Sequence, residues 1–205
     1  MKILQLSAIV EESVYKSAKA IIERDEKLAR DVIAKDEEID NIEVEVEEEC
    51  LKILALHQPV AIDLRFLVAV LKINNDLERI GDLSVNIANA AITLSNRPAI
   101  KIDFEFDRMA DITKLMLKKS LDSLVNLDVD LAKEVGGHDD IIDDIHRDSY
   151  RKVEEGIKTD PRETNTLLHM LAVSRYIERI ADHTTNTSIS TTSLAVPWGK
   201  ATKRR

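Results

Sequence analysis

A short pattern of residues occurs twice in the chain, and the two copies lie 100 positions apart. Residues 77–82 read LERIGD, and residues 177–182 read IERIAD. The segment 28–42 also returns at 131–145, with an offset of 103. Amphipathic helices share apolar positions by chance, but chance does not explain Glu-Arg-Ile-x-Asp twice at one offset. We therefore expect two similar halves, 1–98 and 99–205, the second with an irregular C-terminal tail.

Few residues in the chain interrupt a helix. Its 205 residues include only 5 Gly and 4 Pro, with 3% aromatic and 33% charged residues, a composition typical of long helices. Capping and proline signals predict six helices, at 3–23, 25–56, 60–95, 103–126, 129–157 and 162–194. Short connections make consecutive helices antiparallel, so the predicted fold is all-α, with three helices in each half and up-down topology.

Heptad spacing predicts which helix faces are buried. In the third helix the predicted seam is Phe66, Val70, Ile73, Leu77, Ile80, Ser84, Ile87, Ala91 and Leu94. In the second it is Leu28, Val32, Ile39, Ile42, Val46, Ile53 and Leu56, interrupted by Lys35 and Glu49.

Charge and cysteine content exclude several classes of protein. A net charge of -9 disfavours nucleic acid as a partner, and the basic residues at 200–205 are expected to form a solvated tail. The single cysteine, Cys50, rules out an internal disulfide. The longest apolar run, 66–71, is too short for a membrane span, and residues 1–20 lack the apolar core of a signal peptide. We expect a soluble cytoplasmic protein with no direct membrane insertion.

Four pairs of carboxylates with i, i+4 spacing stand out. They are Asp36/Asp40, Glu78/Asp82, Asp139/Asp143 and Glu178/Asp182. Asp40 and Glu78 are equally far from Pro59, as are Asp36 and Asp82; in the second half the corresponding midpoints all fall between Asp160 and Pro161. Residues equally far from a turn lie side by side in antiparallel helices, so each hairpin should gather four carboxylates at one level and in one groove.

Four carboxylates in one groove need neutralisation. Arg79 and Arg179 could pair with them, protons could be shared with raised pKa values, or cations could bridge them. The duplication favours cations, and carboxylate oxygens suit Mg, Mn, Ca or iron. A ferritin-type site is not indicated, because Asp143-x-x-His146 is the one near match to its motif. A carboxylate-bridged metalloenzyme and a metal-free structural helical module remain alternatives.

Two segments of the chain resemble the signatures of the PhoU family. They are QPVAIDLR at 58–65 followed by DLERIGD at 76–82 and NIA at 86–88, and IERIADHTTN at 177–186. The resemblance covers about 10–188. It implies two pseudo-symmetric three-helix bundles in a cytoplasmic, often homodimeric protein. It also implies a non-enzymatic negative regulator that links the ATPase subunit of a phosphate transporter to a sensor histidine kinase.

The resemblance also implies a ligand set. Several family members carry multinuclear metal clusters on Asp/Glu-x-x-x-Asp motifs, with iron as the first expectation and Mn, Mg and Zn as alternatives. By position, the ligands would be Asp36, Asp40, Glu78, Asp82, Asp139, Asp143, Glu178 and Asp182.

The second half departs from the family pattern in two places. Gly136 and Gly137 each weaken a helix by about 1 kcal/mol relative to Ala, so we predict a kink before Asp139. The segment 184–192 is rich in Ser and Thr, and we predict that the last helix frays after about residue 188. Both features make the second site less secure than the first.

Overall fold

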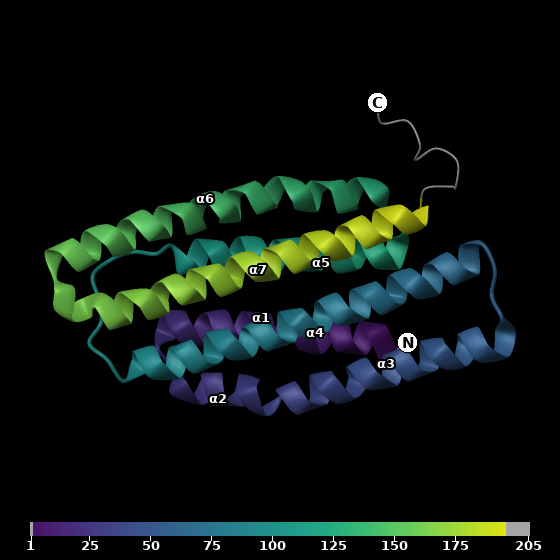
Figure 1. Ribbon diagram of the computed structural model, residues 1–205, viewed down its shortest axis with the longest axis horizontal. Coiled ribbons are helices and arrows are strands. Elements are labelled where there is room, and N and C mark those ends of the chain that lie inside the picture. Colours follow the sequence, from purple (N-terminus) through teal and green to yellow (C-terminus); the bar gives the residue numbers. More distant parts are fainter. Residues whose placement is uncertain (1, 196–205) are drawn as a thin grey trace.

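A computed structural model describes residues 2–195 of the chain, and these residues contain helices and no strand. The helices are α1 (Lys2–Glu23), α2 (Glu26–Ala34), α3 (Asp36–His57), α4 (Ile62–Ser95), α5 (Phe106–Asn126), α6 (Val129–Thr159), the short 3-10 helix η1 (Pro161–Glu163) and α7 (Thr164–Ala195). They run along one long axis, with α1–α4 in one bundle and α5–α7 in the other (Figure 1). The predicted all-α fold is confirmed.

The two bundles share one hydrophobic core. Ile73, Leu77 and Ile80 of α4 are fully buried, and so are their repeat equivalents in α7, Val173, Ile177 and Ile180. These two helices pack side by side, and α1 packs against α5 behind them (Figure 1). The half bounds 1–98 and 99–205 stay a prediction. No helix within residues 2–195 is both long and apolar enough to cross a membrane.

The second predicted helix is in fact two helices that meet at Lys35. The Lys35 amide donates to Val32 O at 3.1 Å, a three-residue spacing that tightens the chain and ends α2. Its ammonium pairs with Glu12 of α1 at 3.2 Å. Helix α3 then starts with Asp36, Glu37 and Glu38, whose charges favour a helix N-terminus. The prediction of one helix over 25–56 was therefore wrong.

The predicted kink in the second half is absent. Helix α6 runs unbroken through Gly136 and Gly137, which lie on an exposed face with open space around them. The break occurs instead in the first half, at Lys35, whose repeat equivalent in α6 is His138. The bonds of the surrounding helix outweigh the weak propensity of two glycines.

Helix α7 does not fray at residue 188 but continues to Ala195. The buried hydroxyls of Thr184, Thr187 and Thr191 donate to carbonyls one turn earlier, at 2.8, 3.1 and 3.1 Å. Each hydroxyl is thus satisfied within the helix and does not need another conformation. Ser120 of α5 donates to Thr184 O at 3.3 Å, so small side chains let the two helices approach closely.

The two hairpins end differently. The α3–α4 hairpin turns through Gln58 and Ala61, both with positive φ, and extends past the other helices (Figure 1). The predicted seam residues at this end are exposed: Ile53 36%, Leu56 76% and Phe66 38%. The end of the α6–α7 hairpin is instead covered by the connection between the bundles, where Phe104 (2% exposed) packs on Val153 and Leu167.

Candidate metal centres in the two hairpins

The first carboxylate cluster consists of Asp36 and Asp40 of α3 with Glu78 and Asp82 of α4. The two helices meet closely at Gly81, where an added Cβ would lie 3.1 Å from Ile39 Cδ1. Ile39 precedes Asp40 and Gly81 precedes Asp82, so the close contact brings their neighbours together. Burial raises the pKa of Asp36, and the charges of Asp40 and Asp82 raise it further.

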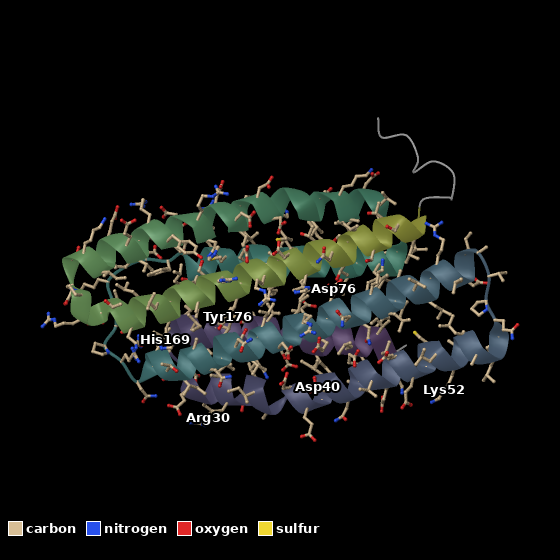
Figure 2. The ribbon with its side chains drawn as sticks, in the orientation of Figure 1. Arg30, Asp40, Lys52, Asp76, His169 and Tyr176 are labelled. Atoms are coloured by element: carbon tan, nitrogen blue, oxygen red, sulfur yellow. The ribbon has the colours of Figure 1, made fainter. Side chains whose placement is uncertain are left out.

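Glu78 responds to the same charges. Burial raises its pKa, and the charges of Asp82, Glu43 and Asp40 add to the rise, while Arg79 opposes it. Among these charges that of Asp40 has the smallest effect, and the convergence of Asp40 and Glu78 across the hairpin stays a prediction. Figure 2 places Asp40 in this hairpin, below the junction between the bundles where Asp76 lies.

A fifth carboxylate, Glu43, belongs beside this cluster and was not among the predicted ligands. Its pKa is raised by burial and by the charges of Glu47 and Asp40. Asn74 of α4 holds it, donating to Glu43 O at 3.0 Å and to Oε1 at 3.1 Å. The signal in the sequence was its position three residues after Asp40, on the same side of the helix.

The second carboxylate cluster consists of Asp139 and Asp143 of α6 with Glu178 and Asp182 of α7. Burial raises the pKa of Asp139 to about 6, and the charges of Asp182 and Asp143 contribute to the rise. Burial also raises the pKa of Glu178, as do Asp182 and Asp143. The pKa of Asp182 is raised by burial and by Asp143, against the opposing charges of His183 and Arg179.

Equivalent oxygens in the two clusters lack hydrogen-bond partners. Asp36 Oδ1 and Asp139 Oδ1 are both buried without a hydrogen bond, while the Thr185 hydroxyl beside Asp139 opposes the rise in its pKa. Glu78 Oε2 is also buried, and Arg79 Nε lies 3.4 Å from it. A buried carboxylate oxygen with no donor is costly, and a hard cation is the kind of partner that such oxygens suit. The donor chemistry therefore fits the predicted metal.

The geometry of the side chains supports a metal site less strongly than the chemistry of the donor atoms does. Within residues 2–195, no three or more His, Cys, Asp or Glu side chains form a group placed to hold a metal ion. The eight ligand assignments, Asp36, Asp40, Glu78, Asp82, Asp139, Asp143, Glu178 and Asp182, stay predictions.

Arginine neutralises the two clusters unequally. In the first, Arg79 Nε lies 3.4 Å from Glu78 Oε2 and its Nη1 lies 3.5 Å from Asp82 Oδ2. Arg79 is 52% exposed, so these contacts contribute little. In the second, Arg179 forms no ion pair with any described residue and acts on Asp182 only through its charge. Neutralisation by arginine, the alternative to a bound cation, is thus supported by side-chain contacts in the first hairpin only.

Histidines lie near the second cluster but have other partners. His146 Nδ1 lies 2.9 Å from Ser174 Oγ, at the positions that Glu43 and Asn74 occupy in the first half. His183 directly follows the predicted ligand Asp182, but its hydrogen-bond partner belongs to the other bundle. Its Nδ1 lies 2.9 Å from Asp76 Oδ1, which links α7 to α4 across the junction between the bundles.

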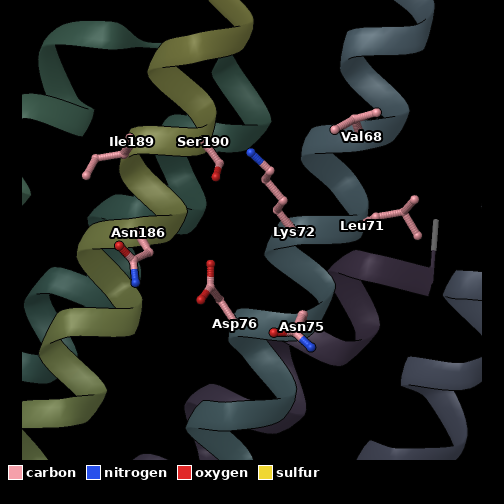
Figure 3. Close-up of a pocket in the computed structure, with 8 residues that line it drawn as sticks. All are labelled: Val68, Leu71, Lys72, Asn75, Asp76, Asn186, Ile189 and Ser190. Carbon is pink, nitrogen blue, oxygen red and sulfur yellow. The ribbon is translucent and has the colours of Figure 1, made fainter.

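Asp76 also borders an open groove of about 570 Å³ between α4 and α7. Figure 3 shows Lys72 extending from α4 toward Ser190, with Asp76 facing Asn186 below it. The groove lies between the two carboxylate clusters and belongs to neither.

Comparisons with known proteins agree with the two-fold repeat. The PhoU domain matches residues 3–91 and again 106–190. A "phosphate-specific transport system accessory protein PhoU homolog" of Aquifex aeolicus is 36% identical over 178 residues, covering 87% of this chain and 80% of the relative. The protein of the same name from Caulobacter vibrioides is 35% identical over 186 residues, covering 90% of this chain and 81% of the relative.

Solved structures are similar over nearly the whole chain. The crystal structure of PhoU from Pseudomonas aeruginosa matches with a TM-score of 0.91 and 31% identity, covering 94% of this chain and 93% of that one. The phosphate transport system regulatory protein PhoU from Streptococcus pneumoniae matches with a TM-score of 0.81 and 26% identity, covering 94% and 91%.

Proposed function

The chain belongs to the PhoU family, and on that premise we propose that it is an accessory protein of a phosphate-specific transport system. It would restrain phosphate uptake and phosphate-responsive signalling when phosphate is plentiful. The observation that supports this proposal is the extent of the similarity: both halves match the family domain, and relatives with that printed name align over most of the chain.

The proposed role is that of an adaptor and not of an enzyme. Its partners would be the ATPase subunit of the transporter and a sensor histidine kinase, and it would act as a homodimer in the cytoplasm. An elongated bundle offers long helical faces for such contacts.

Metal binding is the second part of the proposal. Each cluster would hold metal ions, iron first and Mn, Mg or Zn as alternatives, through Asp36, Asp40, Glu78 and Asp82 in one hairpin and Asp139, Asp143, Glu178 and Asp182 in the other. The ion would supply positive charge that joins the two helices of each hairpin. The supporting observation is the pair of equivalent unpartnered oxygens on Asp36 and Asp139.

A reporter assay tests the regulatory role. In a strain that lacks the gene, alkaline phosphatase is expected to be expressed at high phosphate, and a plasmid copy of the chain should restore repression. Repression that is unchanged by the deletion would contradict the proposed function.

Thermal unfolding with and without a chelator tests the metal. Wild-type protein should lose stability in the chelator, and Asp36→Asn combined with Asp139→Asn should make it insensitive. Asp144→Asn, an exposed position next to the second cluster, is the matched control and should behave as wild type. An unfolding temperature that is the same with and without chelator would favour the metal-free structural module, which the contacts of Arg79 with Glu78 and Asp82 support.

A further inference from the structure

The end of the first hairpin carries a group of exposed apolar side chains that we name the apolar tip. Its residues and their exposed fractions are Leu56 76%, Val60 74%, Ile62 74%, Leu64 41% and Phe66 38%. Single exposed apolar residues are common, but five within eleven positions at one hairpin end are a concentration of the kind that marks an interaction surface.

The corresponding end of the second hairpin has no such patch. It carries charged residues joined in pairs, such as Lys158 with Glu154 at 2.6 Å and Arg162 with Asp160 at 2.8 Å. Its inner apolar face is covered by Phe104 of the connection between the bundles. Within residues 2–195, no segment covers the first tip in that way.

The last described turn of α7 lies beside the apolar tip. A guanidinium nitrogen of Arg65 donates to Ser193 O, so the start of α4 contacts the end of α7. Ile62 and Phe66 share one side of α4 because they lie four positions apart, and Ile62 is about one turn before Arg65, about 4.5 Å along the axis. Figure 1 shows both helix ends at the same end of the molecule.

The chain continues from this point with a segment whose chemistry complements its surroundings. Residues 196–205 read VPWGKATKRR, with apolar residues first and four basic residues after them. The expected solvated tail falls in this segment, which lies outside the described residues. Three extended residues span about 10 Å and ten span about 33 Å, so Trp198 is limited to the neighbourhood of the end of α7, which Arg65 contacts, while the basic residues have a longer reach.

The surface next to the apolar tip is strongly acidic. Helix α3, which leads into the tip, carries Asp36, Glu37, Glu38, Asp40, Glu43, Glu45, Glu47, Glu48 and Glu49, against the single basic residue Lys52 before its C-terminal His57. The last three of these acids lie about two to two and a half turns before Leu56, the first residue of the tip. An apolar patch bordered by negative charge fits an apolar segment followed by positive charge.

We propose that residues 196–205 bind the apolar tip of the same chain, with Trp198 covering Ile62 and Phe66 and the basic residues lying along α3. The segment would cover the first hairpin end much as the connection through Phe104 covers the second. This proposal stands independently of the regulatory role, because it concerns one chain and needs no transporter or kinase.

The tryptophan itself reports on the proposal, since the full chain contains only one. In the full-length protein, acrylamide should quench Trp198 fluorescence several-fold less than in a free peptide of residues 196–205. Ile62→Asp and Leu56→Asp should restore peptide-like quenching, and circular dichroism should show unchanged helix because both side chains are mostly exposed. Leu168→Asp, 51% exposed at the far end of α7, should leave quenching as in wild type.

Two results would overturn the proposal. One is quenching in the wild-type protein equal to that of the peptide. The other is protection that disappears on dilution, which would assign the apolar tip to a second copy of the chain.

Discussion

The two hairpins hold the same four-carboxylate pattern, but their surroundings differ. In the first, α2 and α3 meet at Lys35, Gly81 permits a close helix contact, and the end is apolar and exposed. In the second, α6 is continuous, Ala181 stands at the place of Gly81, and the end is covered. The same sequence pattern of carboxylates is therefore compatible with two different helix packings.

The largest expected effect is on the covered end of the second hairpin. Phe104→Ala should lower the free energy of unfolding by about 3–5 kcal/mol, because the ring is almost fully buried against Val153 and Leu167. Phe66→Ala, on the exposed first end, should cost much less. Urea unfolding of both variants measures the contrast, and equal losses would contradict the described difference between the ends.

The helix contacts next to the two clusters should respond less strongly. Ala181→Gly removes a fully buried methyl and weakens the helix, for a loss of about 1–2 kcal/mol. Gly81→Ala should fail to gain the usual helix stabilisation of about 1 kcal/mol, because the buried Ile39 side chain has little room to move. Unfolding curves of the two variants test this, and a clearly more stable Gly81→Ala protein would show that the contact is loose.

A pH titration sharpens the comparison of the clusters. The pKa of Asp139 is raised from 3.8 to about 6, so the folded, metal-free protein binds more protons than the unfolded chain between these values. The stability that this provides is full below about pH 4 and is lost as pH rises through 6. Because the group is partly exposed, we expect only about 1 kcal/mol.

Asp139→Asn should remove this pH dependence in the metal-free protein and stabilise it at pH 7 by a similar amount. Asp144→Asn, whose carboxylate is largely exposed and paired with Arg147, is the control and should keep the wild-type profile. The test is to measure the free energy of unfolding of the three proteins in chelator from pH 4 to pH 8. An unchanged profile in Asp139→Asn would mean that Asp139 is not the titrating group.

The smallest effects are expected at the arginines. Arg79→Gln should change the stability of the metal-free protein by less than about 0.5 kcal/mol, because its ion pairs are exposed. Arg179→Gln should have an even smaller effect, since Arg179 forms no ion pair with a described residue. A loss above 2 kcal/mol in either variant, measured by urea unfolding, would make arginine the main neutralising group in that hairpin.

Much of this architecture could be predicted from the sequence because the repeat and the two prolines constrain it tightly. Equal distances from Pro59, and from the point between Asp160 and Pro161, predict carboxylates at one level in each hairpin. In each cluster a carboxylate on the facing helix contributes to the raised pKa of Asp36 or Asp139. The seam of α4 was correct from Val70 to Leu94 and wrong only at Phe66. Spacing along a helix cannot show where a hairpin extends beyond its neighbours.

The wrong predictions concern helix continuity. Lysine is a good helix former, so the interruption of the apolar seam at Lys35 did not predict a break in the helix; its ion-pair partner, Glu12, lies on another helix. Gly136, Gly137 and the threonines of α7 have low propensity, but neighbouring bonds keep both helices intact. Whether a helix continues at these positions is decided by bonds to other residues, and the helix propensity of a single residue does not include those bonds.

Metal analysis of the purified protein is the most direct test of whether the two carboxylate clusters bind metal ions. Elemental analysis should find bound metal in the wild type, with part of it lost in Asp36→Asn/Asp40→Asn, another part lost in Asp139→Asn/Asp143→Asn, and none left when all four are changed. Wild-type protein that remains metal-free after purification and reloading, or metal content that ignores all four substitutions, would contradict the account.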